Sequence, residues 1–255
     1  MGVGVGVALE TIWILTQNSE PGSTNFVDAC NGFNEISRLV MLWMVRHRWP
    51  ARVRFLFNCY RHWSQLLLLH PGDTPVILLI REGVTQGDPL LVVLYDITLV
   101  PLSEELRDVD PTLLLPFYAD DAAFEGSSRR SAAQLQLMIY QGTERGYFPE
   151  PAKSLFIACN PEDKEAAKKE FEQAFLNLNY VDSGRYLGVY WGPREELEDW
   201  VQPKVEAWAH GVCTLAKIAK WYPQSAYTGL GMSLQLEWQY LQSTIPGVGS
   251  LMDPI

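Results

Sequence analysis

Apolar and polar positions follow helical and strand periods along the first part of the chain. Residues 8–17 have the pattern of a short helix, and the polar loop 19–23 separates them from a short strand that runs into Asp28. A helix is then predicted through about Val45, because apolar side chains recur at helical spacing. They are Phe33, Ile36, Val40, Trp43 and Met44. Pro50 ends this helix.

A hairpin is predicted after a further helix near residues 55–63. The apolar runs 66–69 and 76–80 are each long enough for a strand. Residues 70–75, which lie between them, are rich in turn-forming types. This order of strand, turn and strand is typical of two antiparallel neighbours.

A second hairpin is predicted around an acidic turn. Residues 113–118 and 122–124 are apolar enough for two short strands. The turn between them carries Asp120 and Asp121. Because Asp favours tight turns, turn chemistry alone is one explanation of the pair, although two acids between apolar strands are a poor choice for that purpose.

The following segment alternates helices with a strand. Ser127 or Ser128 can cap a helix whose inner face holds Leu135, Met138 and Ile139, and residues 153–158 form a strand. Asn160 and Pro161 begin another helix, with an apolar side at Ala167, Phe171, Ala174, Phe175 and Leu178. The order of elements predicts an α+β fold, with helices packed on one face of a mixed or antiparallel sheet.

The last quarter of the chain is expected to be helical. Residues 193–220 and 224–242 have the pattern of two helices. They are rich in tryptophan, at Trp200, Trp208, Trp221 and Trp238. We therefore predict two domains, residues 1–192 around the sheet and residues 193–255 as a helical region.

Composition indicates a folded protein of an intracellular kind. The chain has 255 residues, 47% of them apolar, which suffices for a large core. Its four cysteines are far apart, with no nearby His at zinc spacing, so we expect neither a metal knuckle nor a disulfide framework. The apolar stretch Leu90 to Leu102 is interrupted by Asp96 and is too short to span a membrane, and the start lacks a secretory signature. A soluble protein of the nucleus or cytoplasm is expected.

The net charge of −10 argues against nucleic acid as a partner, but the charge is segregated. Residues 36–72 contain no acidic side chain. Their arginines, interleaved with aromatic residues, are Arg38, Arg46, Arg48, Arg52, Arg54 and Arg61. This basic strip suits a nucleic-acid backbone. An ordinary half-buried helical region, with arginines facing solvent or paired with acids, explains it equally well.

Three carboxylates carry the chemistry that the chain offers. Asp28 follows a predicted strand, and Asp120 and Asp121 share a hairpin turn. Like charges held close together raise each other's pKa or share a cation, and Mg²⁺ is the natural cation for oxygen ligands. For Asp28 alone, a helix N-cap is the common alternative role.

With these residues in place, the chain resembles reverse transcriptases, especially those of non-LTR retroelements. Five motifs occur in the order of that family. They are Asp28 with Phe33, residues 81–90, residues 118–121, residues 146–154 and residues 186–192. The resemblance implies a polymerase palm with a remnant of the fingers over residues 1–192, and a partial, thumb-like region over residues 193–255.

The resemblance also implies roles at the reacting atoms. Asp28 and Asp120 would hold two Mg²⁺ ions, with Mn²⁺ as a substitute, and Asp121 would support the metal cluster. Lys153 would donate a proton to the departing pyrophosphate. A solvated lysine at a strand end is the plain alternative for Lys153.

Further positions would contact substrates. Phe33 would lie under the sugar of the incoming nucleotide and exclude a 2′-hydroxyl, although a Phe on an amphipathic helix is commonly a core residue. Gln86 and Gly87 would lie against the template base, and Tyr118 belongs with these substrate-binding residues. Leu187 and Gly188 would form the primer grip.

The chain departs from the family pattern in three places. Residues 23–25 are more polar than a buried central strand should be, and Leu91 replaces the serine that commonly follows Pro-Leu in the second motif. Fewer than thirty residues precede Asp28, the region in which the fingers supply Lys and Arg to the triphosphate. We expect an excerpt of a larger retroelement polyprotein.

The sequence thus predicts an RNA-directed DNA polymerase domain that adds dNTPs to a DNA primer on an RNA template. The alternative is an inactive, truncated module of the same family that binds RNA or protein through the basic strip. An unrelated Mg²⁺-dependent nuclease would need a further acid near the hairpin, for which Glu125 is the candidate.

Overall fold

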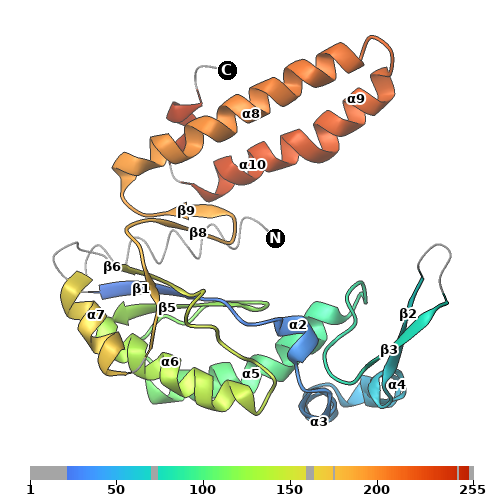
Figure 1. The fold of residues 1–255 in the computed structure, drawn as a ribbon, viewed down its shortest axis with the longest axis vertical. Helices are drawn as coiled ribbons and strands as arrows, with labels where there is room; N and C mark the ends of the chain where they lie inside the picture. The colour runs from blue at the N-terminus through green and yellow to red at the C-terminus, as the bar shows by residue number, and fades with distance from the viewer. Residues whose placement is uncertain (1–21, 70–73, 159–163, 175, 246, 253–255) are drawn as a thin grey trace. The chain divides into compact units, whose positions relative to one another are not determined.

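The computed structural model describes residues 22–69, 74–158, 164–174, 176–245 and 247–252. It divides into two compact units (Figure 1). Among the described residues, the sheet unit holds 22–156 and 164–179, and the helical unit holds 157–158 and 180–252. The helix expected over residues 8–17 lies outside the described residues, and the domain boundary after residue 192 stays a prediction.

A five-stranded sheet organises the sheet unit, with strand order β4-β5-β1-β6-β7. Its central pair is antiparallel and runs from Gly22 opposite Ser127 to Val27 opposite Ala122. The strand bounds are β1 Gly22–Val27, β4 Phe117–Tyr118, β5 Asp121–Ser127, β6 Leu155–Ala158 and β7 Asn179–Tyr180. The predicted strand into Asp28 and the hairpin around Asp120 are confirmed.

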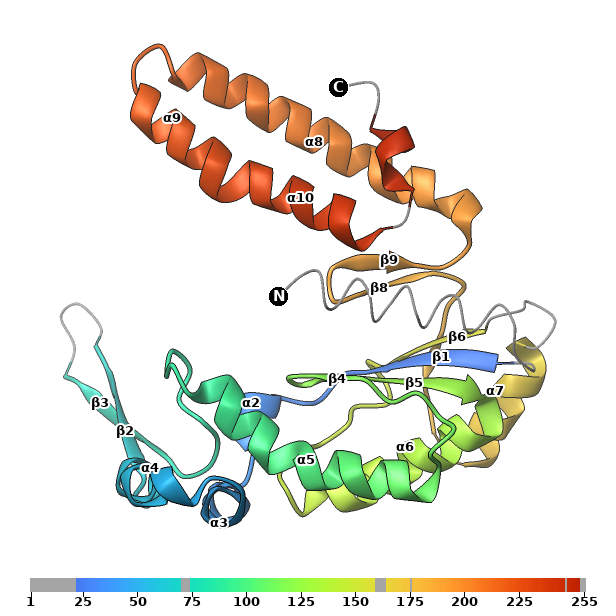
Figure 2. The ribbon, with the colours of Figure 1, turned by 180° about the vertical axis from the view of Figure 1, so that it is seen from behind.

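Three helices cover one face of this sheet (Figures 1 and 2). They are α5 Leu91–Val109, α6 Ser128–Thr143 and α7 Lys164–Gln173. Phe156 of β6 meets Phe171 of α7 edge to face, at 5.3 Å between ring centroids. The predicted α+β class is confirmed. No helix in the described part of the chain combines the length and apolar character needed to cross a bilayer.

The polar start of β1 is buried, contrary to what its composition indicated. Ser23, Thr24 and Asn25 are each at most 1% exposed. Asn25 Nδ2 donates to Ser23 Oγ at 3.2 Å, and Ser128 Oγ of α6 donates to the same oxygen at 3.2 Å. Ser23 and Asn25 therefore face α6, where these hydrogen bonds satisfy Ser23 Oγ and Asn25 Nδ2, whereas Asn25 Oδ1 and Thr24 Oγ1 have no partner among the described residues.

The single helix predicted from Phe33 to Val45 is wrong, because the chain breaks it in two. α2 spans Gly32–Glu35 and α3 spans Arg38–Arg48. At the break the Ile36 carbonyl accepts from Gly83 N–H and the Ser37 N–H donates to the Arg145 carbonyl, each at 2.9 Å. Backbone pairing with distant loops thus replaces the helical hydrogen bonds.

The break also rotates the buried face of α3. Its buried side chains are Arg38, Met41 and Val45, whereas Trp43, predicted on the inner side, is 58% exposed. Sequence spacing alone could not anticipate this, because the predicted face assumed one continuous helix.

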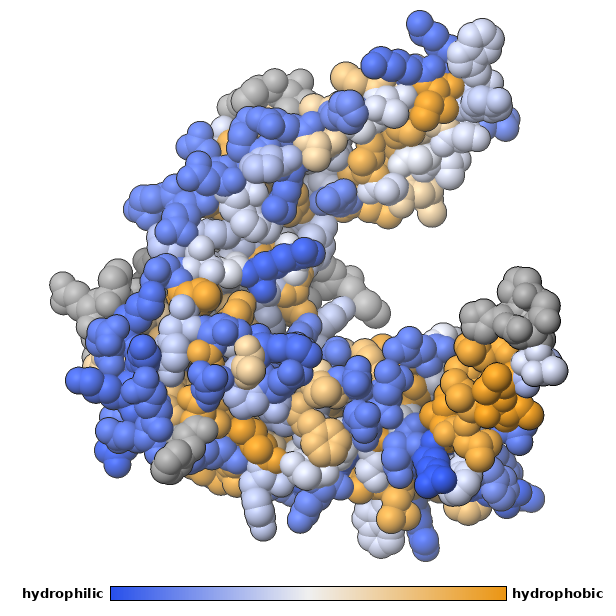
Figure 3. Space-filling view, in the orientation of Figure 1, coloured by the Kyte–Doolittle hydropathy of each residue, from blue (hydrophilic) through white to orange (hydrophobic). Residues whose placement is uncertain are grey.

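The first predicted hairpin is confirmed. After α4 Val53–Tyr60, β2 Ser64–Leu68 pairs antiparallel with β3 Val76–Ile80. Its aliphatic side chains are exposed on both faces, and Figure 3 shows them as a continuous apolar patch. The most exposed are Leu66, Leu67, Leu69, Val76, Ile77 and Leu79.

Arg38 ties this hairpin to α3 and to the loop after β3. Its buried guanidinium donates to the Gly83 carbonyl at 2.8 Å, to the His62 carbonyl at 3.1 Å, and to Ser64 Oγ at 3.3 Å. It also lies 5.5 Å from the centroid of the Tyr60 ring. Burial lowers the pKa of Arg38, and its hydrogen bonds compensate for that desolvation.

The helical unit contains a short hairpin and an antiparallel helical pair. β8 Gly184–Tyr186 pairs with β9 Val189–Trp191. The pair is formed by α8 Leu197–Ile218 and the segment that comprises α9 Pro223–Gly229, a π-helix at Leu230–Leu234 and α10 Gln235–Thr244. Trp208 and Trp238 stack between them at 4.4 Å. The two predicted helices are confirmed, the second with a π-helical irregularity.

Replacing Arg38 with Met should lower the free energy of unfolding by about 2–4 kcal/mol, because several buried acceptors would lose their donor. Arg46→Met is the matched control, since Arg46 is exposed on the same helix and should cost at most about 0.5 kcal/mol. Urea unfolding followed by circular dichroism measures both. Equal stability of the two variants would contradict the role of Arg38.

Candidate active site

Asp28 lies directly after β1, and its backbone is held by the fourth motif. The Asp28 carbonyl accepts from Glu150 N–H at 2.8 Å, and its own N–H donates to Ser154 Oγ at 3.3 Å. Cys30 N–H donates to the Phe148 carbonyl at 2.9 Å. The segment 148–154 therefore fixes the end of β1 and with it the origin of the Asp28 side chain.

Asp28 is not a helix cap. The helix that follows begins at Gly32, and its N-cap position is Asn31, which has a left-handed φ of 46°. Asp28 lies three residues before that cap, so the alternative role weighed for it does not apply.

Asp120 lies in the tight turn between β4 and β5, and Asp121 is the first residue of β5. Tyr118 pairs with Asp121, which leaves Ala119 and Asp120 as the turn residues. Ala119 has φ of 55°, an uncommon value for a residue with a Cβ. The buried Tyr147 supports the turn, because its hydroxyl donates to the Asp120 carbonyl at 3.1 Å.

The register of β1 with β5 brings the acids together. Val27 lies opposite Ala122, so the next position on each strand places Asp28 beside Asp121. Because side chains alternate along a strand, both acids belong to the face opposite the one on which Ser23 and Asn25 meet α6. Burial, and then the charges of Asp120 and Asp28, raise the pKa of Asp121 to about 6. The three carboxylates are therefore within Coulombic range.

Gly32 permits the first motif to approach the acidic turn. A Cβ at this position would lie 2.8 Å from Asp120 Cβ and 2.7 Å from the Tyr95 hydroxyl. Both contacts are shorter than atoms tolerate, so a larger residue here would push α2 away from Asp120. The glycine is explained by this close approach.

Tyr95 of α5 is a site residue that sequence analysis missed. It is fully buried, and its hydroxyl has no hydrogen-bond partner among the described residues. Burial, followed by the charges of Asp120, Asp96 and Asp121, raises its pKa far above the usual range. Its ring packs on Phe33 at 4.7 Å. A tyrosine within an apolar helix gives no sequence signal for this position.

Phe33 is half-buried on α2, one residue after the glycine that meets the turn. Its contact with Tyr95 is a packing contact, as expected of a core residue. Its intermediate burial leaves part of the residue accessible to solvent. The structure thus allows both roles weighed for Phe33.

Lys153 is exposed and forms an ion pair with Glu150, at 2.6 Å between Nζ and Oε2. The hydrogen bond to Glu150 and its charge raise the pKa of Lys153, with a smaller contribution from Asp28. The ammonium form is therefore favoured at neutral pH. The influence of Asp28 places Lys153 within electrostatic range of the acids.

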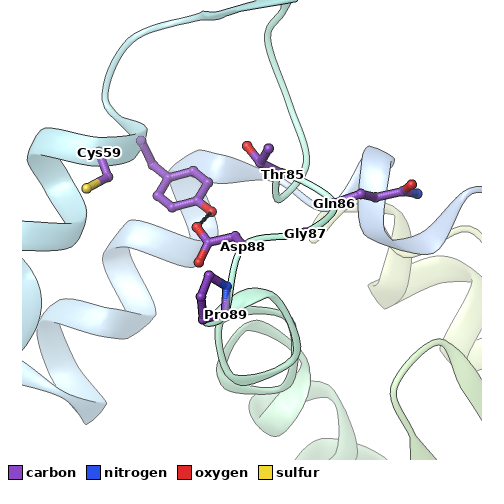
Figure 4. A pocket seen from close by; sticks show the side chains of 7 residues that line it. Cys59, Thr85, Gln86, Gly87, Asp88 and Pro89 are labelled. Carbon is purple, nitrogen blue, oxygen red and sulfur yellow. Dashed lines mark hydrogen bonds between the residues drawn. The ribbon is translucent and has the colours of Figure 1, made fainter. Parts of the chain in front are cut away.

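The second motif forms the loop before α5 and one wall of an open pocket of about 520 Å³ (Figure 4). Gln86 and Gly87 are exposed there, and Gly87 has φ of 91° with open space around it. Asp88 Oδ1 accepts from Leu90 N–H at 2.8 Å, and the Tyr60 hydroxyl donates to Asp88 Oδ2. Asp88 thus stabilises the turn that leads into α5.

Three predicted substrate residues lie in turns or strand ends. Tyr118 is 45% exposed at the end of β4. Leu187 and Gly188 belong to the helical unit, where they form the left-handed turn between β8 and β9 with φ of 48° and 83°. The Tyr240 hydroxyl donates to the Leu187 carbonyl, so α10 holds this turn.

Glu125 does not supply the further acid that a nuclease site would need near the hairpin. It lies on β5 four residues after Asp121, which is about 13 Å along a strand. It is 5% exposed, and burial raises its pKa to about 8. A neutral carboxyl at that distance cannot share an ion with Asp121.

Mg²⁺ fits the candidate site in ligand type. Carboxylate oxygens are its preferred protein ligands. The carboxylates of Asp28, Asp120 and Asp121 repel one another here. Among the described residues, no three His, Cys, Asp or Glu side chains form a ready-made metal cluster. A cation would therefore have to draw the carboxylates closer together.

Comparison with known proteins gives matches among solved structures. No protein-family model and no curated protein matches the chain. Apo telomerase from Candida tropicalis matches with a TM-score of 0.54 and 12% identity over 75% of this chain and 36% of that chain. Telomerase from Candida albicans, in complex with a fragment of telomeric RNA, matches with a TM-score of 0.54 and 12% identity. The match covers 73% of this chain and 33% of that chain.

The fold is reverse-transcriptase-like. At 12% identity the likeness shows the fold alone, and the present chain spans about a third of the length of these telomerase chains. The sheet with helices on one face and the following helices agree with a palm-like arrangement.

Replacing Asp121 with Asn should stabilise the protein above pH 6 in the presence of a chelator. The folded state raises the pKa of Asp121 from 3.8 to about 6, so it holds this proton at a higher pH than the unfolded chain does. Stability is therefore lost as pH rises through this interval. Discounted for partial exposure, the gain from Asn should be about 1–2 kcal/mol at pH 7 and absent near pH 4.

The control for this prediction is Asp110→Asn. Hydrogen bonds from Thr112 lower the pKa of Asp110, so the same substitution should destabilise the protein at pH 7. Urea unfolding across pH measures both variants. A loss of stability in Asp121→Asn at pH 7 would refute the proposed repulsion.

Proposed function

We propose that this chain is an RNA-directed DNA polymerase domain, of the type found in non-LTR retroelements, that adds dNTPs to a primer 3′-hydroxyl. The observation that carries the proposal is the convergence of Asp28, Asp120 and Asp121 at neighbouring strands of a reverse-transcriptase-like sheet. Three acids in mutual repulsion suit a site that works with divalent cations.

Asp28 and Asp120 would hold two Mg²⁺ ions, and Asp121 would support them. Bound there, the ions would activate the primer hydroxyl and stabilise charge on the transferring phosphate. The protein's own contribution is to fix the positions of these acids. The segment 148–154 fixes the Asp28 backbone, and Tyr147 fixes that of Asp120.

Lys153 would protonate the departing pyrophosphate. Its raised pKa keeps it in the ammonium form, and its exposed side chain can reach an incoming phosphate by leaving Glu150. The proton would then move from Nζ to a pyrophosphate oxygen.

The template would be RNA and the primer DNA. Two of the telomerase structures similar to this chain are complexes with a fragment of telomeric RNA, which supports RNA as a partner. Within the basic strip, the arginines Arg46, Arg52 and Arg54 are exposed, whereas Arg38 is buried and Arg48 pairs with Glu104 at 2.5 Å. Arg61 of the strip is exposed as well, so four guanidiniums would remain for a phosphate backbone. Further domains of a retroelement polyprotein would complete the enzyme.

Primer extension on an RNA template with Mg²⁺ tests the function. The wild type should incorporate dNTPs, and Asp120→Asn should lower incorporation at least about 100-fold, because one of the carboxylates that would hold the Mg²⁺ ions would be lost. Asp108→Asn, an exposed acid on α5, is the matched control and should leave the rate unchanged. Incorporation that persists in Asp120→Asn would remove the active-site assignment.

Phe33 is proposed to select deoxynucleotides. Phe33→Val should raise the efficiency of ribonucleotide relative to deoxynucleotide incorporation at least about tenfold, since the smaller side chain admits a 2′-hydroxyl. The ratio of kcat/KM for the two substrates measures it. Phe55→Val, at an exposed aromatic of α4, is the control. An unchanged ratio with normal dNTP use would assign Phe33 to packing alone.

A second candidate is an inactive module of the same fold that binds a protein or RNA. The exposed aliphatic hairpin β2–β3 favours it, because a patch of this kind commonly marks a protein interface. RNA or protein binding without any incorporation would support this candidate.

A further inference from the structure

The helical unit contains a segment whose charge is opposite to that of the chain. No acidic residue occurs between Glu206 and Glu237, although the whole chain has a net charge of −10. Lys217 lies in the last turn of α8 and Lys220 in the turn that follows it, and both are exposed. Neither forms an ion pair with another described residue. Local charge therefore favours an anionic partner.

Three aromatic rings are exposed next to these lysines. Trp221, Tyr222 and Tyr227 lie at the turn into α9 and on its first turns, with 80%, 66% and 79% of their surface exposed. Aromatic side chains of this size normally bury most of their area, so three within seven residues form an unusual surface. We name Lys217, Lys220, Trp221, Tyr222 and Tyr227 the aromatic tip.

The backbone beneath the aromatic tip is ordered by hydrogen bonds and packing. The Ile218 carbonyl accepts from the N–H groups of Trp221 and Tyr222, at 3.0 and 2.9 Å. Pro223 begins α9, and Ala226 is buried beneath the turn. The rings are thus carried on a defined turn and have few torsions to restrict on binding.

We propose that the aromatic tip binds single-stranded nucleic acid. Bases stack on exposed aromatic faces with little regard to sequence, and lysines next to the rings neutralise phosphates of the same strand. The pairing of cationic and aromatic side chains without acids matches this ligand in charge and in shape. The aromatic tip belongs to the helical unit and the three acids to the sheet unit, and binding at the tip would need neither divalent cations nor dNTPs.

Binding of a labelled single strand of about 20 nucleotides, in chelator and at several salt concentrations, tests the proposal. Trp221→Ala with Tyr227→Ala should weaken binding about tenfold at every salt concentration. Lys217→Gln with Lys220→Gln should reduce the slope of log affinity against log salt by about 1.4, the value for two phosphates of a single strand. Affinity for a duplex of the same length should change less than affinity for the single strand.

Tyr140→Ala is the matched control, because Tyr140 is 75% exposed on α6 of the sheet unit with no lysine at its side. It should bind like the wild type, as should Asp120→Asn, so the result is independent of polymerase activity. Circular dichroism establishes that each variant is folded. Unchanged single-strand affinity in both folded double variants would overturn the proposal. So would binding of anionic lipid vesicles, with a Trp221-dependent emission shift, in place of nucleic acid.

Discussion

The antiparallel register of β1 with β5 is the constraint on which the candidate site depends. It sets Val27 against Ala122, and so makes neighbours of Asp28 and Asp121, which are 93 positions apart in the chain. Side chains alternate between the two faces of a sheet. A shift of one strand by one residue relative to the other would therefore place one of the two acids on the helix-covered face. The buried polar residues at the start of β1 guard against such a slip, since Ser23 is hydrogen-bonded to Ser128.

Other contacts hold α2, the turn at Asp120 and the loop before α5 in place around the two paired strands. Gly32 lets α2 approach Asp120, and the Tyr147 hydroxyl holds the turn through its hydrogen bond to the Asp120 carbonyl. The hydrogen bond from Tyr60 to Asp88 anchors the loop before α5. Burial raises the pKa of Tyr60 to about 12, and its bond to Asp88 acts in the same direction. Repulsion among the acids is therefore imposed by a rigid surrounding structure, as expected where function opposes stability.

Sequence predicted the elements that local rules determine. The hairpin around Asp120 and the long helices followed from turn residues and apolar periodicity. It failed where distant partners decide. The break at Ile36 arises from backbone bonds to Gly83 and Arg145, and buried Arg38 is held by acceptors at His62 and on the hairpin at Ser64. Tyr95 carried no local signal because only the packed structure places its hydroxyl beside Gly32 and Asp120.

A double-mutant cycle between Asp28 and Asp121 tests most directly whether the two strands hold these carboxylates close enough to repel each other. Unfolding free energies would be measured in chelator for Asp28→Asn, Asp121→Asn and the double variant. Above pH 7 the double variant should gain about 0.5–1.5 kcal/mol less than the sum of the single variants, because one repulsion can be relieved only once. Near pH 4 this coupling should vanish as Asp121 takes up its proton. Additive effects above pH 7 would contradict the account.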